Sequence, residues 1–155
     1  DPAQGLVFDG RVTEDFKLDT GTWVSVGILR PDLVAACSPY VQDAVIAGQD
    51  KPFAAALVWP SAAAMQSLAA AVGPENALAK LQEILRERLA VHNAAAGGSS
   101  RKVARFLVML EPPSIDSGEI TDKGYINQAL ARQRRAAEVE RLYAEQPDEA
   151  VVRLS

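Results

Sequence analysis

The most constraining feature of this sequence is a pair of apolar runs at 43–47 and 53–59, separated by Gly48-Gln49-Asp50 and little else. Continuous runs of β-branched and apolar residues are typical of strands that are buried on both faces. The link between the runs is short and made of turn-forming residues. The two runs therefore predict adjacent antiparallel strands in the core.

Helices are predicted on either side of these strands. Ser61 is suited to cap a helix over 62–72, which Gly73-Pro74 ends, and a further helix follows to about residue 95 with its leucines on one stripe. A short amphipathic helix before Pro39 is indicated by apolar residues at helical spacing, namely Leu29, Leu33, Val34 and Cys37.

Strand signals also occur towards the two ends of the chain. Residues 16–18 and 22–26 flank a turn at Asp19-Thr20-Gly21 and predict a β-hairpin, and residues 103–110 predict another strand. Residues 125–145 predict one final helix with a modest apolar stripe through Ile126, Leu130, Ala137 and Leu142. The pattern predicts an α+β domain: a small central, mostly antiparallel sheet with an N-terminal β-hairpin and flanking helices.

Composition excludes several classes of protein. Lys plus Arg number 16 against 20 Asp plus Glu, and the acidic residues are scattered, which argues against a nucleic-acid partner. Cys37 is the only cysteine, so neither an intrachain disulfide nor a zinc cluster is expected, and a reducing, cytoplasmic location fits best. We find no pattern of a membrane span or a signal peptide. The chain opens on Asp1-Pro2, and we expect it to be cut from a longer protein.

Two segments of the chain resemble motifs of a known superfamily. Residues 10–17, GRVTEDFK, followed by residues 21–25, GTWVS, resemble the glycine-arginine hinge and hairpin that open the C-terminal domain of AMP-forming adenylating enzymes. Residues 111–124, EPPSIDSGEITDKG, resemble the motif that closes the same domain. The superfamily includes acyl-CoA synthetases, peptide-synthetase adenylation domains and luciferases. Within it, the residues of both segments are similar to those of feruloyl-CoA synthetases.

The resemblance implies an organisation and an activity. Residues 1–12 would be the end of a linker from a missing N-terminal domain, and residues 13–155 would be the mobile C-terminal domain of an ATP-dependent acid–CoA ligase that forms AMP. Ferulate or a related aromatic acid is the implied substrate, with ATP and CoA as co-substrates and Mg²⁺ in the parent enzyme. This domain alone would bind no cofactor or metal, and we expect the isolated chain to fold without turnover.

The N-terminal motif implies residues for nucleotide binding and for domain rotation. Arg11 offers several fixed donors for the ribose or phosphate of an adenylate. Without the motif around it, a surface arginine in a solvated turn would be the favoured interpretation. Thr13 matches the hinge residue by position, with Glu14 beside it, and the family usually has Asp or Lys there. The alternative for Glu14 and Asp15 is an acidic turn that leads into a strand.

The predicted hairpin carries three further residues that the resemblance assigns. Lys17, Gly21 and Trp23 would line the pantetheine channel after the domain has rotated. Gly21 would leave room for a narrow thiol arm, and Lys17 could meet a phosphate or the adenylate. The alternative for Trp23 is a packed core aromatic. The hairpin is one residue longer than the common pattern.

The lysine of the closing motif is displaced in this chain. Glu119 stands directly after Ser117-Gly118, where most relatives carry the adenylation lysine, and a carboxylate there would repel both reacting anions. A cation that contacts both the acid and the α-phosphate would stabilise the transition state. We therefore expect Lys123 to be the shifted catalytic residue. The alternative is that Lys123 is a surface lysine and the parent is a variant enzyme.

Other polar residues are predicted to have structural roles. His92 is expected to be a solvated residue near a helix end, and Cys37 a small packed core residue. Arg132, Arg134 and Arg135 are expected on a solvated, salt-bridged helix face, with the diphosphate of CoA as the alternative contact.

The sequence leaves two alternative functions open. In the first, the same domain belongs to an adenylating enzyme that serves a carrier-protein phosphopantetheine or a reductase module. In the second, the chain is a standalone interaction module without a catalytic role.

Overall fold

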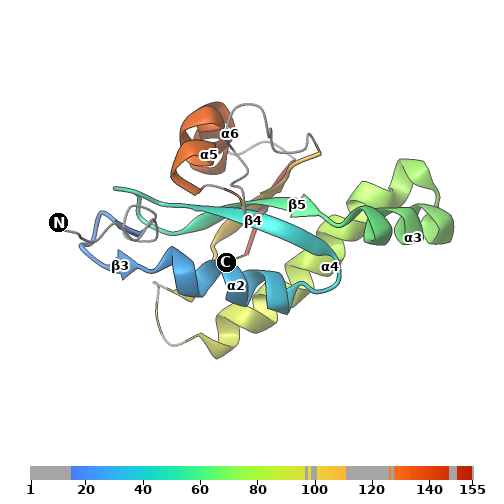
Figure 1. Ribbon diagram of the computed structural model, residues 1–155, viewed down its shortest axis with the longest axis horizontal. Helices are drawn as coiled ribbons and strands as arrows, with labels where there is room; N and C mark the ends of the chain where they lie inside the picture. The colour runs from blue at the N-terminus through green and yellow to red at the C-terminus, as the bar shows by residue number, and fades with distance from the viewer. Residues whose placement is uncertain are drawn as a thin grey trace, which may run out of the picture.

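The computed structural model of the chain describes residues 15–96, 98, 101–110, 126, 128–146 and 150–154. These residues form a two-stranded hairpin and a separate four-stranded sheet, and helices pack on both faces of the larger sheet (Figure 1). The predicted α+β class, with an N-terminal hairpin and flanking helices, is confirmed. No helix in this part of the chain has both the length and the apolar character that a membrane span requires.

The two apolar runs form the core of the four-stranded sheet. β4 (Val41–Ala47) and β5 (Ala55–Pro60) pair antiparallel, as predicted. β6 (Arg105–Val108) pairs parallel with β5, and β7 (Val151–Arg153) pairs antiparallel with β6, so the strand order is β4-β5-β6-β7. β7 is absent from the sequence prediction, because a strand of 3 residues carries too little pattern to be distinguished from a loop.

Both faces of the sheet are covered by helices. The face that includes Ile46 packs against α2 (Val26–Ala36), α4 (Pro74–Ala95) and the hairpin. The opposite face, which includes Val45, packs against the C-terminal helices (Figure 1). Successive residues of a strand point to opposite faces, so a strand covered on both sides must be apolar throughout. This is why β4 and β5 are near-continuous apolar runs.

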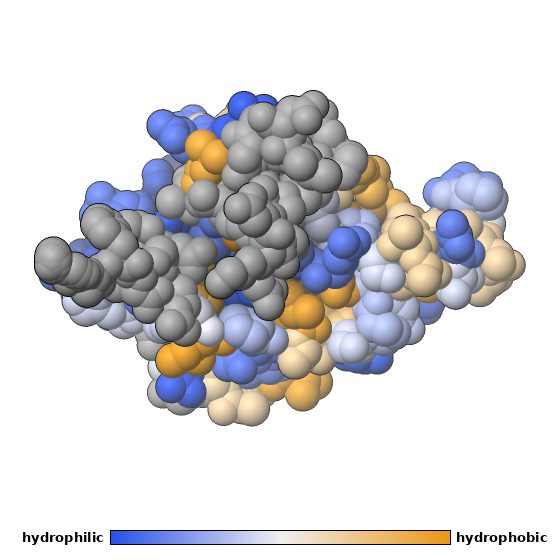
Figure 2. Space-filling view, viewed as in Figure 1, coloured by the Kyte–Doolittle hydropathy of each residue, from blue (hydrophilic) through white to orange (hydrophobic). Residues whose placement is uncertain are grey.

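The two central helices begin where the sequence predicts. The Ser61 hydroxyl accepts a hydrogen bond from the Ala64 N–H at 3.1 Å and so caps α3 (Ala62–Val72). Pro74 stands at the start of α4, whose core-facing stripe is fully buried at Leu81, Leu85 and Leu89. The solvent side of α3 carries mainly Ala, Ser and Gln, and Figure 2 shows this end of the molecule in pale colours.

The prediction of one continuous C-terminal helix is wrong. The described residues form α5 (Gln128–Arg134) and α6 (Ala136–Leu142), and Arg135 between them has non-helical backbone angles of φ −102° and ψ 31°. The break changes which side of the chain faces the sheet. Leu142 is buried as predicted, whereas Ala137 of the expected apolar stripe is exposed.

The outer edge of β4 is closed by a side chain of α5. The Gln128 side chain is buried; its Oε1 accepts from the Ile46 N–H at 3.0 Å and its Nε2 donates to the Ala44 carbonyl oxygen at 2.8 Å. Arg132 Nη1 donates to the Ile46 carbonyl oxygen at 3.0 Å. An edge strand otherwise presents unpaired backbone groups, so α5 takes the place of a further strand.

Gln128→Ala is expected to destabilise the chain by about 1–3 kcal/mol, because it leaves a buried backbone donor and a buried acceptor of β4 without partners. Urea denaturation should show a lower unfolding midpoint. Gln133→Ala is the matched control, since Gln133 lies on the same helix and is exposed. Equal midpoints for the two variants would contradict a structural role for the Gln128 amide.

Candidate functional site

The hairpin presents one buried and one exposed face. β2 (Phe16–Lys17) pairs antiparallel with β3 (Trp23–Val24), with Phe16 opposite Val24 and Lys17 opposite Trp23. Phe16 and Val24 are buried in the core of the domain, together with Leu18. Side chains alternate across a strand, so the anchoring of one pair turns the other pair outwards. The three residues predicted to line the channel therefore belong to one element that is anchored in the core.

Trp23 is displayed to solvent on this element. Its side chain is 60% exposed, and Lys17 Nζ lies 5.2 Å from the centroid of its ring. This distance is within the range of a cation–π contact, which keeps the lysine over the indole face. The alternative that Trp23 is a packed core aromatic is wrong. An exposed indole with an adjacent ammonium group is a surface suited to a ligand that has both apolar and anionic parts.

Gly21 forms the turn of the hairpin. Its φ angle is +87°, and its N–H donates to the Leu18 carbonyl oxygen at 2.9 Å. A residue with a Cβ atom rarely adopts this backbone conformation. A Cβ atom at Gly21 would meet no atom of the described chain within 4 Å, so the space beside the turn is open.

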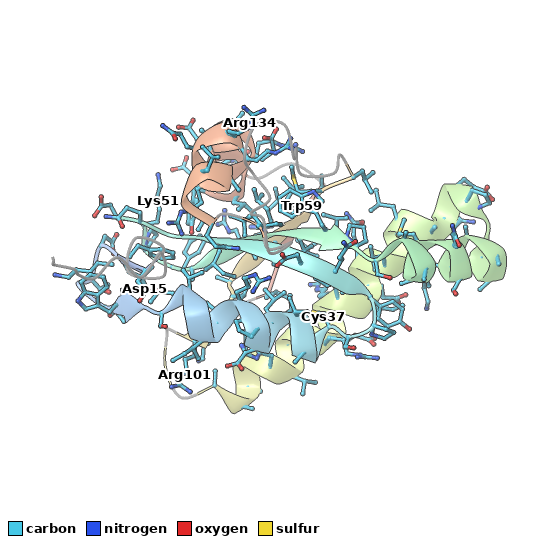
Figure 3. All side chains as sticks on the ribbon, viewed as in Figure 1. Asp15, Cys37, Lys51, Trp59, Arg101 and Arg134 are labelled. Carbon is cyan, nitrogen blue, oxygen red and sulfur yellow. The ribbon has the colours of Figure 1, made fainter. Side chains whose placement is uncertain are left out.

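Asp15 holds the start of the hairpin against α2. Its Oδ1 accepts a hydrogen bond from the Val26 N–H at 2.9 Å, in the first turn of that helix. Ser25 occupies the N-cap position but makes no side-chain capping bond. A carboxylate is favourable at a helix N-terminus, so Asp15 acts as a long-range cap. Asp15 therefore has a structural role, and Figure 3 shows it at the hairpin end of α2.

The turn between β4 and β5 supports the hairpin from the other side. The Asp50 N–H donates to the Lys17 carbonyl oxygen, and the Asp19 N–H donates to the Lys51 carbonyl oxygen, both at 2.9 Å. A Cβ atom at Gly48 would lie 2.8 Å from Phe16 Cε1, so only glycine allows this close approach. The sequence marks Gly48 as a turn residue, and no local pattern indicates that it contacts the hairpin.

Arg132 is half-buried and bonds the core of the domain, rather than lying wholly on a solvated helix face as predicted. Besides its bond to the Ile46 carbonyl oxygen, its guanidinium group lies 5.3 Å from the centroid of the Phe16 ring. Arginine stacks readily on aromatic rings and carries several donors, which explains how it can join α5 to both the sheet and the hairpin.

His92 and Cys37 both have structural roles in the domain. His92 Nε2 lies 2.8 Å from the Arg101 carbonyl oxygen, which ties the end of α4 to the segment before β6. Cys37 is a buried core residue, as predicted. Burial raises the pKa of the Cys37 thiol to about 12, against a smaller lowering by Arg88. The thiol therefore stays protonated near neutral pH and is a poor nucleophile.

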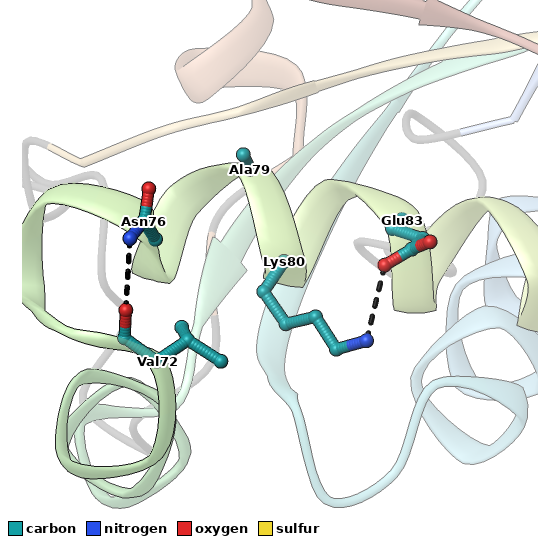
Figure 4. Close-up of a pocket in the computed structure, with 5 residues that line it drawn as sticks. All are labelled: Val72, Asn76, Ala79, Lys80 and Glu83. Atoms are coloured by element: carbon teal, nitrogen blue, oxygen red, sulfur yellow. Dashed lines mark hydrogen bonds and ion pairs between the residues drawn. The ribbon is translucent and has the colours of Figure 1, made fainter.

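A hollow of about 370 Å³ lies between α3 and α4, at the opposite end of the molecule from the hairpin (Figure 1). Its polar side chains pair locally: Asn76 Nδ2 donates to the Val72 carbonyl oxygen at 2.9 Å, and Lys80 Nζ lies 3.1 Å from Glu83 Oε1 (Figure 4). The polar groups do not converge on the hollow, so it is not the candidate site.

The remaining predicted site residues are not placed by the structure. Arg11, Thr13, Glu14 and Lys123 lie outside the described residues, as does the linker predicted over 1–12. Among the described residues, no group of three or more His, Cys, Asp or Glu side chains is arranged to hold a metal ion. The candidate site in the described chain is therefore the exposed face of the hairpin, formed by Lys17, Gly21 and Trp23.

Comparison with known proteins defines the class to which this domain belongs. The chain is a member of the family described as the AMP-binding enzyme C-terminal domain, whose model matches residues 29–147. It is therefore a domain of an adenylate-forming enzyme. The match includes Ser117-Gly118 and Lys123 but begins after the hairpin. None of the curated proteins matches this chain.

Solved structures of adenylation domains have the same fold. The adenylation domain of a carboxylate reductase from Mycobacterium chelonae has a TM-score of 0.64 and 23% identity over 87% of this chain and 20% of that chain. The A-PCP didomain of a carboxylic acid reductase from Segniliparus rugosus, in complex with AMP, has a TM-score of 0.65 and 24% identity over 85% of this chain and 17% of that chain. The chain thus spans a fifth or less of these structures, and at such identities the likeness shows the fold.

Proposed function

We propose that this chain is the mobile C-terminal domain of an ATP-dependent acid–CoA ligase that forms AMP. In this proposal, Lys123 acts in adenylation, and the hairpin lines the pantetheine channel after the domain has rotated. The observation that carries the proposal is the exposed Lys17 and Trp23 pair beside the open turn at Gly21, within a domain of this family.

The first half-reaction would use residues at the two ends of the chain. A carboxylate oxygen of the acid attacks the α-phosphorus of ATP, pyrophosphate leaves, and an acyl-adenylate forms. Lys123 would sit between the two anions and reduce their repulsion, while Arg11 would bind the ribose or a phosphate. ATP, Mg²⁺ and the acid would be held mainly by an N-terminal domain of the same polypeptide.

The second half-reaction would use the hairpin. Rotation about Thr13 and Glu14 would bring it to the adenylate, where the thiolate of the pantetheine arm attacks the acyl carbonyl and AMP leaves. The indole face of Trp23 offers apolar contact to the arm, and the ammonium group of Lys17 offers contact to a phosphate. The open space beside Gly21 would leave room for the pantetheine arm.

The proposed substrate follows from the resemblance in the sequence. Ferulate or a related aromatic acid is proposed because residues 5–11, 14–18 and 118–124 are similar to feruloyl-CoA synthetases. A cytoplasmic enzyme fits the supply of ATP and CoA. The isolated chain is expected to have no turnover, because the acid pocket and the phosphate-binding loop would lie in the N-terminal domain.

A second candidate acceptor is a carrier protein. It is favoured by the structural likeness to carboxylic acid reductases, one of them an A-PCP didomain. The reacting group would be the same pantetheine thiol, so the hairpin would keep its role. Acyl transfer in the parent enzyme, tested with free CoA and with a phosphopantetheine-bearing carrier protein, distinguishes the two acceptors.

Gly21→Ala in the parent enzyme is expected to slow acyl transfer about tenfold or more, which corresponds to about 1.4 kcal/mol in the barrier. The added methyl group projects into the space proposed for the arm and strains a turn with φ +87°. Adenylate formation, measured by ATP–pyrophosphate exchange, should change less than about twofold. Gly98→Ala is the matched control, because a Cβ atom at Gly98 would also meet no atom of the described chain within 4 Å and Gly98 belongs to neither motif.

Equal losses in both half-reactions would contradict the assignment of the hairpin to acyl transfer. An interaction module without a catalytic role makes a different prediction, since Arg11 and Lys123 could then be replaced without loss of any activity of the parent protein.

A further inference from the structure

A cluster of aromatic and cationic side chains includes residues of the β4–β5 turn that supports the hairpin. The proposed function does not use this cluster. The rings of Phe53 and Tyr143 stack with their centroids 4.9 Å apart. The Arg105 guanidinium group lies 4.9 Å from the centroid of Phe53, and Lys51 Nζ lies 5.4 Å from the centroid of Tyr143. These residues come from the β4–β5 turn, from β6 and from the end of α6. The cluster therefore joins segments that are far apart in sequence.

The hydroxyl group of Tyr143 closes the base of the β4–β5 turn. It lies 2.7 Å from the Phe53 carbonyl oxygen and 3.1 Å from the Ala47 carbonyl oxygen, and its single proton is shared between them. Burial raises the pKa of Tyr143 above its ordinary range, against a smaller lowering by Arg105. The phenol therefore keeps its proton near neutral pH and remains a donor.

Tyr143 is itself held in place by β6. Arg105 Nη1 donates to the Leu142 carbonyl oxygen at 2.8 Å and to the Ala144 carbonyl oxygen at 2.9 Å. These two acceptors flank Tyr143 in sequence. The Arg105 guanidinium group and the β4–β5 turn thus fix the Tyr143 ring relative to the sheet.

The turn closed by Tyr143 is the one that supports the hairpin. Its Asp50 N–H and Lys51 carbonyl oxygen bond the backbone of Lys17 and Asp19, as described above. The Tyr143 hydroxyl group therefore bonds the β4–β5 turn, and this turn bonds the hairpin that carries Lys17 and Trp23. A small shift of the turn would move the hairpin relative to the rest of the domain.

We propose that Tyr143 is a positioning residue for acyl transfer: by closing the β4–β5 turn, it sets the place of the hairpin and hence of Lys17 and Trp23. This inference rests on the proposed role of the hairpin. Tyr143 touches no reacting atom in this scheme. Its effect should therefore appear in acyl transfer and should be absent from adenylation.

The test is Tyr143→Phe in the parent enzyme, which keeps the stacked ring and removes the hydroxyl group. Acyl transfer in single-turnover experiments should slow about threefold to tenfold. This change in rate corresponds to the loss of one neutral hydrogen bond. ATP–pyrophosphate exchange should stay within about twofold of the unmodified enzyme. The matched control is Tyr40→Phe, because Tyr40 contacts Arg88 on another side of the domain.

A second measurement separates positioning from general damage. Amide hydrogen exchange of Asp19 and Asp50 should become faster in Tyr143→Phe, while the buried core of α4 should exchange as before. Unchanged exchange at both amides together with unchanged acyl transfer would overturn the inference. If Tyr143→Phe and Gly21→Ala both leave transfer unchanged while exchange at Asp19 and Asp50 increases, the proposed function of the hairpin fails and the structural connection stands.

Discussion

Lys123→Ala in the parent enzyme is expected to lower the rate of adenylate formation about 100- to 1000-fold, the effect of removing one preorganised group that stabilises developing charge. The repulsion between the acid and the α-phosphate would then lack a cation in the transition state. ATP–pyrophosphate exchange measures this half-reaction. Acyl transfer from a preformed acyl-adenylate should be nearly unchanged, because the domain would present its other face at that stage.

Two further variants make this prediction specific. Lys102→Ala should have little effect, because Lys102 is an exposed lysine before β6 and lies outside both motifs. Glu119→Lys, added to Lys123→Ala, should restore part of the lost rate by placing a lysine where most relatives carry it. Normal adenylation by Lys123→Ala would refute the proposed role and would support the alternative of a surface lysine in a variant enzyme.

Asp43→Ala is expected to lower the free energy of unfolding by about 2–3 kcal/mol, the usual cost of losing a hydrogen bond between charged groups that are largely shielded from water. Asp43 Oδ1 lies 2.6 Å from Arg30 Nε and also accepts from the Ala44 N–H at 2.8 Å. The two side chains are only 12% and 23% exposed, so water screens the pair weakly. The substitution removes the carboxylate that links α2 to β4.

Glu83→Ala is the matched control for this second prediction. Glu83 forms an exposed ion pair with Lys80 at 3.1 Å, and the two side chains are 61% and 45% exposed. Surface pairs of this kind contribute about 0–1 kcal/mol. Urea denaturation should therefore separate the two variants clearly, and a similar loss for both would show that the Arg30–Asp43 pair has no special role.

Much of the fold can be predicted because its elements are encoded by neighbouring residues. The two apolar runs around Gly48 predict β4 and β5, and Ser61 predicts the start of α3, since each signal involves residues a few positions apart. The C-terminal part is harder to predict. β7 forms through pairing with β6, and the break at Arg135 depends on how α5 and α6 cover the sheet.

The candidate site, like the fold, can be predicted only in part from the sequence. The hairpin pattern predicts that Lys17 and Trp23 share a strand pair, and the register confirms it. The exposure of Trp23 is not visible in the sequence, because it depends on which face of the hairpin the core buries. The placement of Lys123 and Arg11 stays a prediction from the motifs.

By itself, the sequence determined the class of fold, the hairpin and the central strands, because these depend on local periodicity and turn residues. The tertiary structure alone decided what supports the hairpin. Asp15 caps α2 from 11 positions away, and Tyr143 bonds the Phe53 carbonyl oxygen from 90 positions away. No local pattern encodes such pairs, because their hydrogen bonds form only after the sheet and helices have packed.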